Sequence, residues 1–149
     1  MITAWRLVSQ ARAGSAFDGE GSYQSGNRWN HPGTRVVYLA ATTSLAALEV
    51  LVHAGSPDHL TPFRAFGVQI PEELVLELPT LPEGWRQSPA PPVTQDAGSR
   101  WVASGASTVL RVPSAIAPWE FNYLVSVNHP GFGRLSIGEP VPFQFDRRP

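Results

Sequence analysis

The residue that the sequence marks most clearly as a candidate for chemistry is Glu49. It is a carboxylate inside the apolar run 43–53, which reads Thr-Ser-Leu-Ala-Ala-Leu-Glu-Val-Leu-Val-His. On a helix, apolar side chains surround Glu49 on nearly every side, which predicts a buried helix. No arginine lies three or four residues away; only His53 does. Because an ionised carboxylate without a partner is costly in such a place, Glu49 is a candidate general base or a fixed charge beside a developing cation. The alternative, a surface glutamate on an amphipathic helix, conflicts with these neighbours.

Three further positions carry groups suited to binding, and each has an ordinary structural alternative. Arg28, in the loop 26–30 (Gly-Asn-Arg-Trp-Asn), could clamp a phosphate or carboxylate through two parallel N–H groups, or could be a solvated arginine beside a buried Trp29. Tyr38 lies on an expected strand, where a core role is the more common one. Ser114 follows a proline at a strand end and lacks the G-x-S-x-G context of a hydrolase nucleophile, so a turn or capping role is its alternative.

The composition excludes several kinds of chemistry. The chain has no cysteine, so it can form neither a disulfide nor a zinc–thiolate site. All 11 basic residues are arginine, which excludes a P-loop or Schiff-base lysine and leaves anion recognition to guanidinium groups. The histidines show no metal-ligand spacing, so we expect no metal site. A net charge of −1 gives no reason to expect binding to nucleic acid or to a membrane surface.

The length and the hydrophobic pattern predict one α+β domain over residues 1–149. No apolar run reaches 18 residues and no signal peptide is evident, so we expect a cytoplasmic protein. Strands outnumber helices and do not alternate with them regularly, which disfavours a doubly wound sheet. Thr43 or Ser44 is the expected N-cap of the first helix, and Gly55 its stop. The expected strands are 2–8, 36–40, 64–70, 74–78, 108–112, 122–127, 135–137 and 141–145; the expected helices are 42–53 and 94–104; and the expected loops are 14–30 and 79–92.

Taken in order, these segments resemble the RES domain, the toxin half of Xre–RES toxin–antitoxin systems, which is named for an Arg, a Glu and a Ser. The matching positions are Arg28, Glu49 and Ser114. One departure is Asn27, where the family usually has a second glycine; asparagine tolerates positive φ better than most residues. Another is Val-Ser-Val before Asn128, where a Leu-Asn-Pro-like stretch is usual. The likeness extends over nearly the whole chain through Trp5-Arg6, Tyr38, Glu120-Phe121-Asn122, Asn128-His129-Pro130 and Phe145-Asp146-Arg147-Arg148.

The resemblance implies a fold akin to ADP-ribosyltransferases and NAD⁺ as the substrate, so that no separate cofactor is needed. Glu49 would stabilise the cation that develops on the ribose, Arg28 would hold the pyrophosphate or ribose side, and Tyr38 would pack against the nicotinamide or ribose. These three are the expected catalytic residues. The expected NAD⁺-binding residues are Arg6, Arg28, Tyr38, Ser114 and Asn122.

The resemblance leaves the reaction open in one respect and also implies a partner. The acceptor of the ADP-ribose could be water, phosphate or a protein side chain. A non-catalytic module that binds a nucleotide or a protein is a further alternative. The expected partner is a cognate Xre-type antitoxin that covers the cleft, and a homodimer within that complex is left open.

Overall fold

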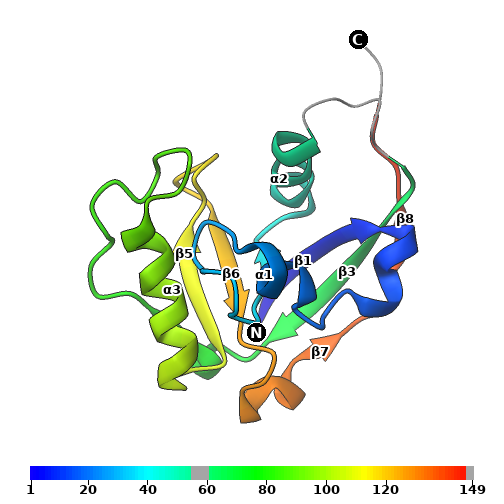
Figure 1. The fold of residues 1–149 in the computed structure, drawn as a ribbon. Helices are drawn as coiled ribbons and strands as arrows, with labels where there is room; N and C mark the ends of the chain where they lie inside the picture. Colours follow the sequence, from blue (N-terminus) through cyan, green and yellow to red (C-terminus); the bar gives the residue numbers. More distant parts are fainter. Residues whose placement is uncertain (55–60, 147–149) are drawn as a thin grey trace.

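The computed structural model describes residues 1–54 and 61–146, which are organised around one mixed sheet (Figure 1). Its eight strands follow the order β4-β5-β6-β2-β1-β3-β7, with β8 paired to β3. The strands are β1 (Ile2–Ser9), β2 (Val37–Ala40), β3 (Phe63–Ile70), β4 (Val75–Glu77), β5 (Val109–Pro113), β6 (Phe121–Val125), β7 (Ser136–Ile137) and β8 (Val141–Phe143). The helices are α1 (Glu20–Ser25), α2 (Thr43–Ala54) and α3 (Pro92–Ser104), and the 3-10 turns include η1 (Gln10–Ser15), η3 (Glu72–Leu74) and η4 (Pro130–Arg134).

The α+β class and the expected strands and long helices are confirmed, but the loop expected at 14–30 contains a helix. Glycines in the left-handed region flank α1: Gly19 has φ 73° and Gly26 has φ 70°. The carboxylate of Asp18 accepts a hydrogen bond from the backbone N–H of Glu20 at 2.9 Å. A helix of six residues is too short to show a clear hydrophobic period, so the sequence pattern missed it.

The sheet opens between β1 and β2, and this gap positions the site. β1 pairs with β3 over eight residues, and β2 pairs with β6 over four. Between β1 and β2 there is only one register pair, Trp5 with Ala40. Further along the gap, the guanidinium Nη1 of Arg6 donates to the carbonyl of Tyr38 at 3.3 Å, where a backbone ladder would otherwise continue. The two strands therefore diverge beside their single contact.

Helices α2 and α3 cover neighbouring parts of the same sheet face. Tyr38 and Ala40 are two residues apart on β2, so their side chains share a face. Tyr38 packs against the hydrophobic cluster that contains Trp101 of α3, whereas Ala40 packs with Leu45 of α2. Figure 1 shows α3 beside β5 and β6, with α2 standing apart from it toward β1. The opposite face carries a separate core cluster, comprising Ala4, Val37, Leu39, Val68, Ile70, Val109, Tyr123, Val125 and Leu135.

The prediction that α2 is buried nearly all round is wrong. Only Leu45 and Ala46 of this helix are buried, whereas Leu48 and Val52 are 45% and 62% exposed. The helix packs against β1 and β2, and its outer side is exposed at Leu48 and Val52. The Oγ of Thr42 accepts from the N–H of Leu45 at 3.0 Å, so Thr42 caps the helix rather than either of the two residues that follow it. The expected stop residue, 55, lies outside the described residues.

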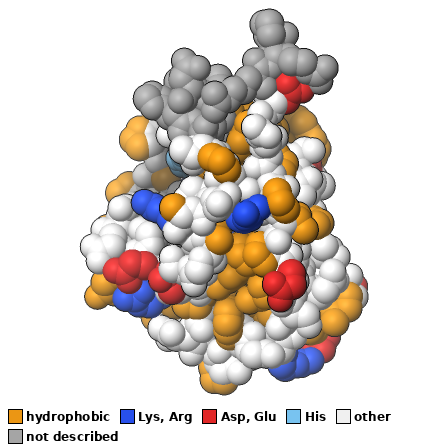
Figure 2. All heavy atoms as spheres, turned by 90° about the vertical axis from the view of Figure 1, so that its right-hand side faces the viewer, with side chains coloured by type: hydrophobic (Ala, Val, Ile, Leu, Met, Phe, Trp, Pro, Cys, Tyr) orange, Lys and Arg blue, Asp and Glu red, His pale blue; other side chains and the backbone are white. Residues whose placement is uncertain are grey.

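A second side of the molecule also exposes apolar side chains. Ile137 on β7 and Val141 on β8 are 39% and 50% exposed. Figure 2 shows hydrophobic side chains gathered on this side of the molecule, with charged ones scattered around them. In the part of the chain that the structure describes, no helix is both long and apolar enough to span a membrane.

Candidate active site

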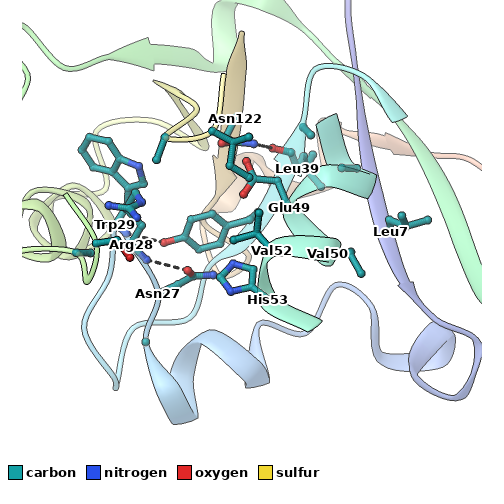
Figure 3. Close-up of a pocket in the computed structure, with 18 of the residues that line it drawn as sticks. Leu7, Asn27, Arg28, Trp29, Leu39, Glu49, Val50, Val52, His53 and Asn122 are labelled. Carbon is teal, nitrogen blue, oxygen red and sulfur yellow. Dashed lines mark hydrogen bonds between the residues drawn. The ribbon is translucent and has the colours of Figure 1, made fainter. Parts of the chain in front are cut away.

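A cavity of about 700 Å³ lies where β1 and β2 diverge, between α2 and the loop 26–30 (Figure 3). Five of the six residues expected to form the site line it: Arg6, Arg28, Tyr38, Glu49 and Asn122. These residues come from β1, the loop before β2, β2 itself, α2 and β6. The tertiary structure therefore brings together positions that are scattered over more than a hundred residues of sequence.

The carboxylate of Glu49 is held by the sixth residue, Ser114, which is fully buried. The Oγ of Ser114 donates to Oε1 of Glu49 at 3.1 Å. The Oγ of Ser114 also accepts from the N–H groups of Ile116 at 3.0 Å and Ala117 at 3.2 Å. Because a hydroxyl has one hydrogen and two lone pairs, these contacts use its full capacity. Ser114 thus orients Glu49 and closes its own turn, and it does not line the cavity.

Arg28 lies at the tip of the loop 26–30, half-buried at the cavity wall. Its Nη1 donates to the carbonyls of Trp85 at 3.0 Å and Gln87 at 2.6 Å, both in the proline-rich loop. Among the described residues no carboxylate forms an ion pair with this guanidinium. Trp29 beside it is buried, as the alternative expected, whereas the guanidinium of Arg28 is held by the loop and its charge is available to an anionic ligand.

Asn27 does not need the positive φ that its place in the family pattern suggested. Among the described residues every positive φ belongs to a glycine, including Gly26 just before it. A Cβ on Gly26 would lie 2.9 Å from Cδ of Pro32, which adds a steric reason for glycine there. Asn27 contributes its side chain instead: Oδ1 accepts from the N–H of Arg28 at 2.8 Å.

Arg6 provides a second positive charge at the cavity. Its Nε donates to the carbonyl of Ala16 at 3.0 Å, in addition to the Nη1 bond to Tyr38 across the strand gap. Burial lowers the pKa of Arg6 to about 10, although the charge of Asp18 opposes this shift. Arg6 is therefore still a cation at neutral pH.

Tyr38 presents its ring, and not its hydroxyl, to the cavity. The hydroxyl donates to Oδ1 of Asn30 at 2.8 Å and accepts from the N–H of Trp29 at 3.0 Å. Burial raises the pKa of Tyr38, against the opposing effects of the Trp29 N–H and the charge of Arg28. Since the hydroxyl is bonded on both sides and stays protonated, proton transfer is not open to it, and the ring can only pack against a ligand.

Two further polar residues of the cavity are Asn122 and His53. The Nδ2 of Asn122 donates to the carbonyl of Leu39 at 3.4 Å, and its side chain lies near Glu49 (Figure 3). His53 follows Glu49 by one helical turn and projects from α2 toward Asn27 in the same view. The sequence pointed to His53 only as a neighbour of Glu49, at the spacing i,i+4. Among the described residues no group of three or more His, Asp or Glu side chains could hold a metal ion.

Comparison with known proteins places the chain in a family. The model of the RES domain matches residues 3–146, nearly the whole chain. The chain belongs to the RES domain family. The resemblance carried by Arg28, Glu49 and Ser114 is thereby confirmed.

Two curated relatives support this assignment and extend it to named toxins. "Toxin Res" of Yersinia enterocolitica is 38% identical over 147 residues, which cover 97% of each chain. The "Prs ADP-ribosylating toxin" of a Sphingobium strain is 37% identical and is covered over 94% of its length. This RES-family chain therefore aligns over most of its residues with toxins, one of which is named for ADP-ribosylation.

A solved structure shows that the fold is shared as well. The crystal structure of the MbcT–MbcA toxin–antitoxin complex of M. tuberculosis matches with a TM-score of 0.77 over 95% of this chain and 84% of the other. The sequence identity is 21%, so this likeness bears on the fold alone. It supports the α+β class derived from the strand and helix pattern.

Proposed function

We propose that this RES-family protein is the NAD⁺-consuming toxin of a toxin–antitoxin system and that it breaks the bond between nicotinamide and ribose. The observation that supports this most directly is the carboxylate of Glu49, oriented by Ser114 at a cavity that also holds the guanidinium groups of Arg28 and Arg6. One fixed negative charge and two positive charges match a substrate that combines a pyrophosphate with a ribose that becomes cationic.

The proposed reaction balances without a metal or an organic cofactor. The bond from the ribose carbon to the pyridinium nitrogen breaks, and its electron pair leaves with nicotinamide, which becomes neutral. The ribose is then left as an oxocarbenium-like cation, much as in glycoside hydrolysis. Glu49 stabilises this cation electrostatically and binds the ribose hydroxyl groups. An acceptor adds to the same carbon and releases a proton.

The other cavity residues bind the substrate in this proposal. Arg28 and Arg6 hold the pyrophosphate, with Arg28 aimed by its two bonds to the proline-rich loop. The ring of Tyr38 packs against the nicotinamide or the ribose, and Asn122 hydrogen-bonds the ribose. Ser114 contributes through Glu49, because its hydroxyl has no further bond to give.

The test of this function is nicotinamide release by the purified protein and by Glu49→Gln. The amide keeps the size of the carboxylate and can still accept from Ser114, so the fold is retained while the charge is lost. We expect release to fall by about 100-fold or more. Glu139→Gln, an exposed position away from the cavity, is the matched control and keeps wild-type activity. Absence of release from the free wild-type protein, or equal release from Glu49→Gln, contradicts the catalytic proposal.

A second candidate, transfer of ADP-ribose to a protein, is favoured by the name of the Sphingobium relative. The bond-breaking step is the same, and only the acceptor differs. Products distinguish the acceptors: water gives free ADP-ribose, phosphate gives a phosphorylated ADP-ribose, and a protein acceptor gives labelled lysate proteins. Saturable binding of NAD⁺ without turnover would instead identify a non-catalytic module.

The proposed partner is an Xre-type antitoxin that covers the cavity. The structural neighbour was solved as a toxin–antitoxin complex, which supports an antitoxin as the partner. The exposed Leu48 and Val52 lie on α2, the helix that borders the cavity, and offer an apolar surface for it. Co-expression with the neighbouring reading frame tests this: we expect a stable complex with suppressed NAD⁺ cleavage, and chromatography of the complex reports whether it contains two copies of the toxin.

A further inference from the structure

Asn30 is a fully buried polar residue that the proposed function does not use. Its two amide N–H groups are shared among three carbonyls of its own segment: Ser22 at 3.1 Å, His31 at 2.9 Å and Thr34 at 3.4 Å. Its Oδ1 accepts from the hydroxyl of Tyr38 at 2.8 Å. A buried amide is costly unless its groups are paired, and here both ends are.

The backbone of Asn30 closes the turn that carries Arg28. The N–H of Asn27 donates to the carbonyl of Asn30 at 3.0 Å, and the N–H of Asn30 donates back at 3.3 Å. From α3, the Nε2 of Gln95 donates to the carbonyls of Asn27 at 3.1 Å and Asn30 at 3.4 Å. Arg28 therefore lies on a small closed turn that is fixed to α3 on one side.

The bond from Asn30 to Tyr38 fixes this turn to the sheet on the other side. The hydroxyl of Tyr38 also accepts from the N–H of Trp29, so both of its hydrogen bonds go to the turn. The backbone of Tyr38 lies on β2 and its ring lines the cavity. These two hydrogen bonds couple the position of the turn that carries Arg28 to the orientation of the Tyr38 ring, and the bond to Asn30 is the one made by a side chain of the turn.

We propose that Asn30 is a positioning residue that holds Arg28 and the ring of Tyr38 at a fixed spacing across the cavity. This inference rests on the proposed function, because it concerns how NAD⁺ is held there. Glu49 lies on α2 and Ser114 follows β5, and the hydroxyl of Ser114 bonds to Glu49 and to its own turn. Loss of Asn30 therefore weakens ground-state binding and leaves the stabilisation of the ribosyl cation nearly intact.

The experiment uses three variants: Asn30→Ala, Tyr38→Phe and the double variant that combines them. The control is Asn128→Ala, because Asn128 is exposed and lies outside the cavity. Binding of ADP-ribose is measured by calorimetry, and KM and kcat are measured from nicotinamide release. We expect each single variant to raise Kd and KM about tenfold while kcat changes far less. The double variant should lose clearly less than the sum of the two single losses, because both substitutions remove the bond between Tyr38 and Asn30. Additive losses, or a fall in kcat with unchanged KM, overturn the proposal.

A second readout does not depend on NAD⁺. The indole rings of Trp29 and Trp85 are stacked with centroids 6.1 Å apart, so their coupled circular dichroism reports the position of the turn. We expect this signal to be lost in Asn30→Ala and Tyr38→Phe while both proteins still unfold cooperatively. A retained signal together with wild-type affinity overturns the proposal. If the wild type neither binds ADP-ribose nor cleaves NAD⁺, the proposed function fails, and the dichroism alone decides the role of Asn30. If Asn30→Ala does not fold, Tyr38→Phe removes the same bond from the other side and decides in its place.

Discussion

At the scale of single residues, the hydroxyl of Ser114 links the site to the stability of its turn. Ser114→Ala removes the donor to Glu49 and leaves the N–H groups of Ile116 and Ala117 without their acceptor. We expect a loss of about 1–3 kcal/mol in the free energy of unfolding and a clear fall in kcat. Urea unfolding and nicotinamide release measure the two effects.

The matched control for this prediction is Ser107→Ala. The hydroxyl of Ser107 accepts from Nε1 of Trp101 and donates to the carbonyl of Val109, both at 2.8 Å, and none of these three residues lines the cavity. We expect a similar loss of stability with kcat unchanged. An equal fall in kcat in both variants would show that Ser114 acts through stability alone.

The buried hydroxyl of Tyr38 predicts a specific dependence of stability on pH. Because burial raises the pKa of Tyr38 in the folded state, its contribution is fully present below its unfolded pKa of about 10 and is lost as the pH rises above that value. The stability difference between the wild type and Tyr38→Phe should therefore shrink above about pH 10. Urea unfolding of both proteins at neutral and alkaline pH checks this, and a constant difference would contradict it.

At the scale of elements, the close packing of α3 against the turn 26–30 depends on Gly98. A Cβ on Gly98 would lie 1.7 Å from the carbonyl oxygen of Trp29, which is backbone and cannot move aside easily. Gly98→Ala must therefore separate α3 from the turn. We expect destabilisation of more than about 2 kcal/mol, together with a raised KM for NAD⁺.

The control for Gly98→Ala is Gly21→Ala, which also replaces a glycine within a helix, here α1. A Cβ there meets nothing within 4 Å, so the substitution should be neutral or stabilising by up to about 1 kcal/mol through helix propensity. Thermal unfolding and steady-state kinetics separate the two variants. Wild-type stability in Gly98→Ala would contradict the close packing of α3 on the turn.

At the scale of the whole molecule, the gap between β1 and β2 requires a group that bridges it without closing it. Arg6 does this from β1, at the cost of burying a cation. We expect Arg6→Met to change the free energy of unfolding by less than about 2 kcal/mol, because lost hydrogen bonds and relieved desolvation offset each other. KM should rise by about tenfold or more, because one anion contact is lost.

The pH dependence of binding provides an independent check on Arg6. Since its pKa is lowered to about 10, the affinity of the wild type for NAD⁺ should fall as the pH rises through that value. Arg6→Met should lack this component. Arg100→Met, at a side chain that is 81% exposed, serves as the control and should leave KM unchanged. A wild-type KM in Arg6→Met would remove Arg6 from the binding site.

The local sequence pattern determined the elements and the available chemistry. Alternating and periodic apolar residues mark the strands and the two long helices, because these patterns reflect contacts within one contiguous segment. The absence of lysine and cysteine, the arginine-only cations and the isolated Glu49 limited the chemistry before any fold was known. The family pattern then named Arg28, Glu49 and Ser114 as a set.

Only the tertiary structure decided how these residues act. Glu49 and Ser114 are 65 residues apart, and their contact depends on how α2 lies over the end of β5. The same packing leaves Leu48 and Val52 exposed, although their apolar character predicted burial. The hydroxyl of Tyr38 is directed at Asn30, because the turn 26–30 folds back onto β2. Sequence periodicity shows which side chains share a face of one element, whereas their partners depend on the crossing of elements that are distant in the chain.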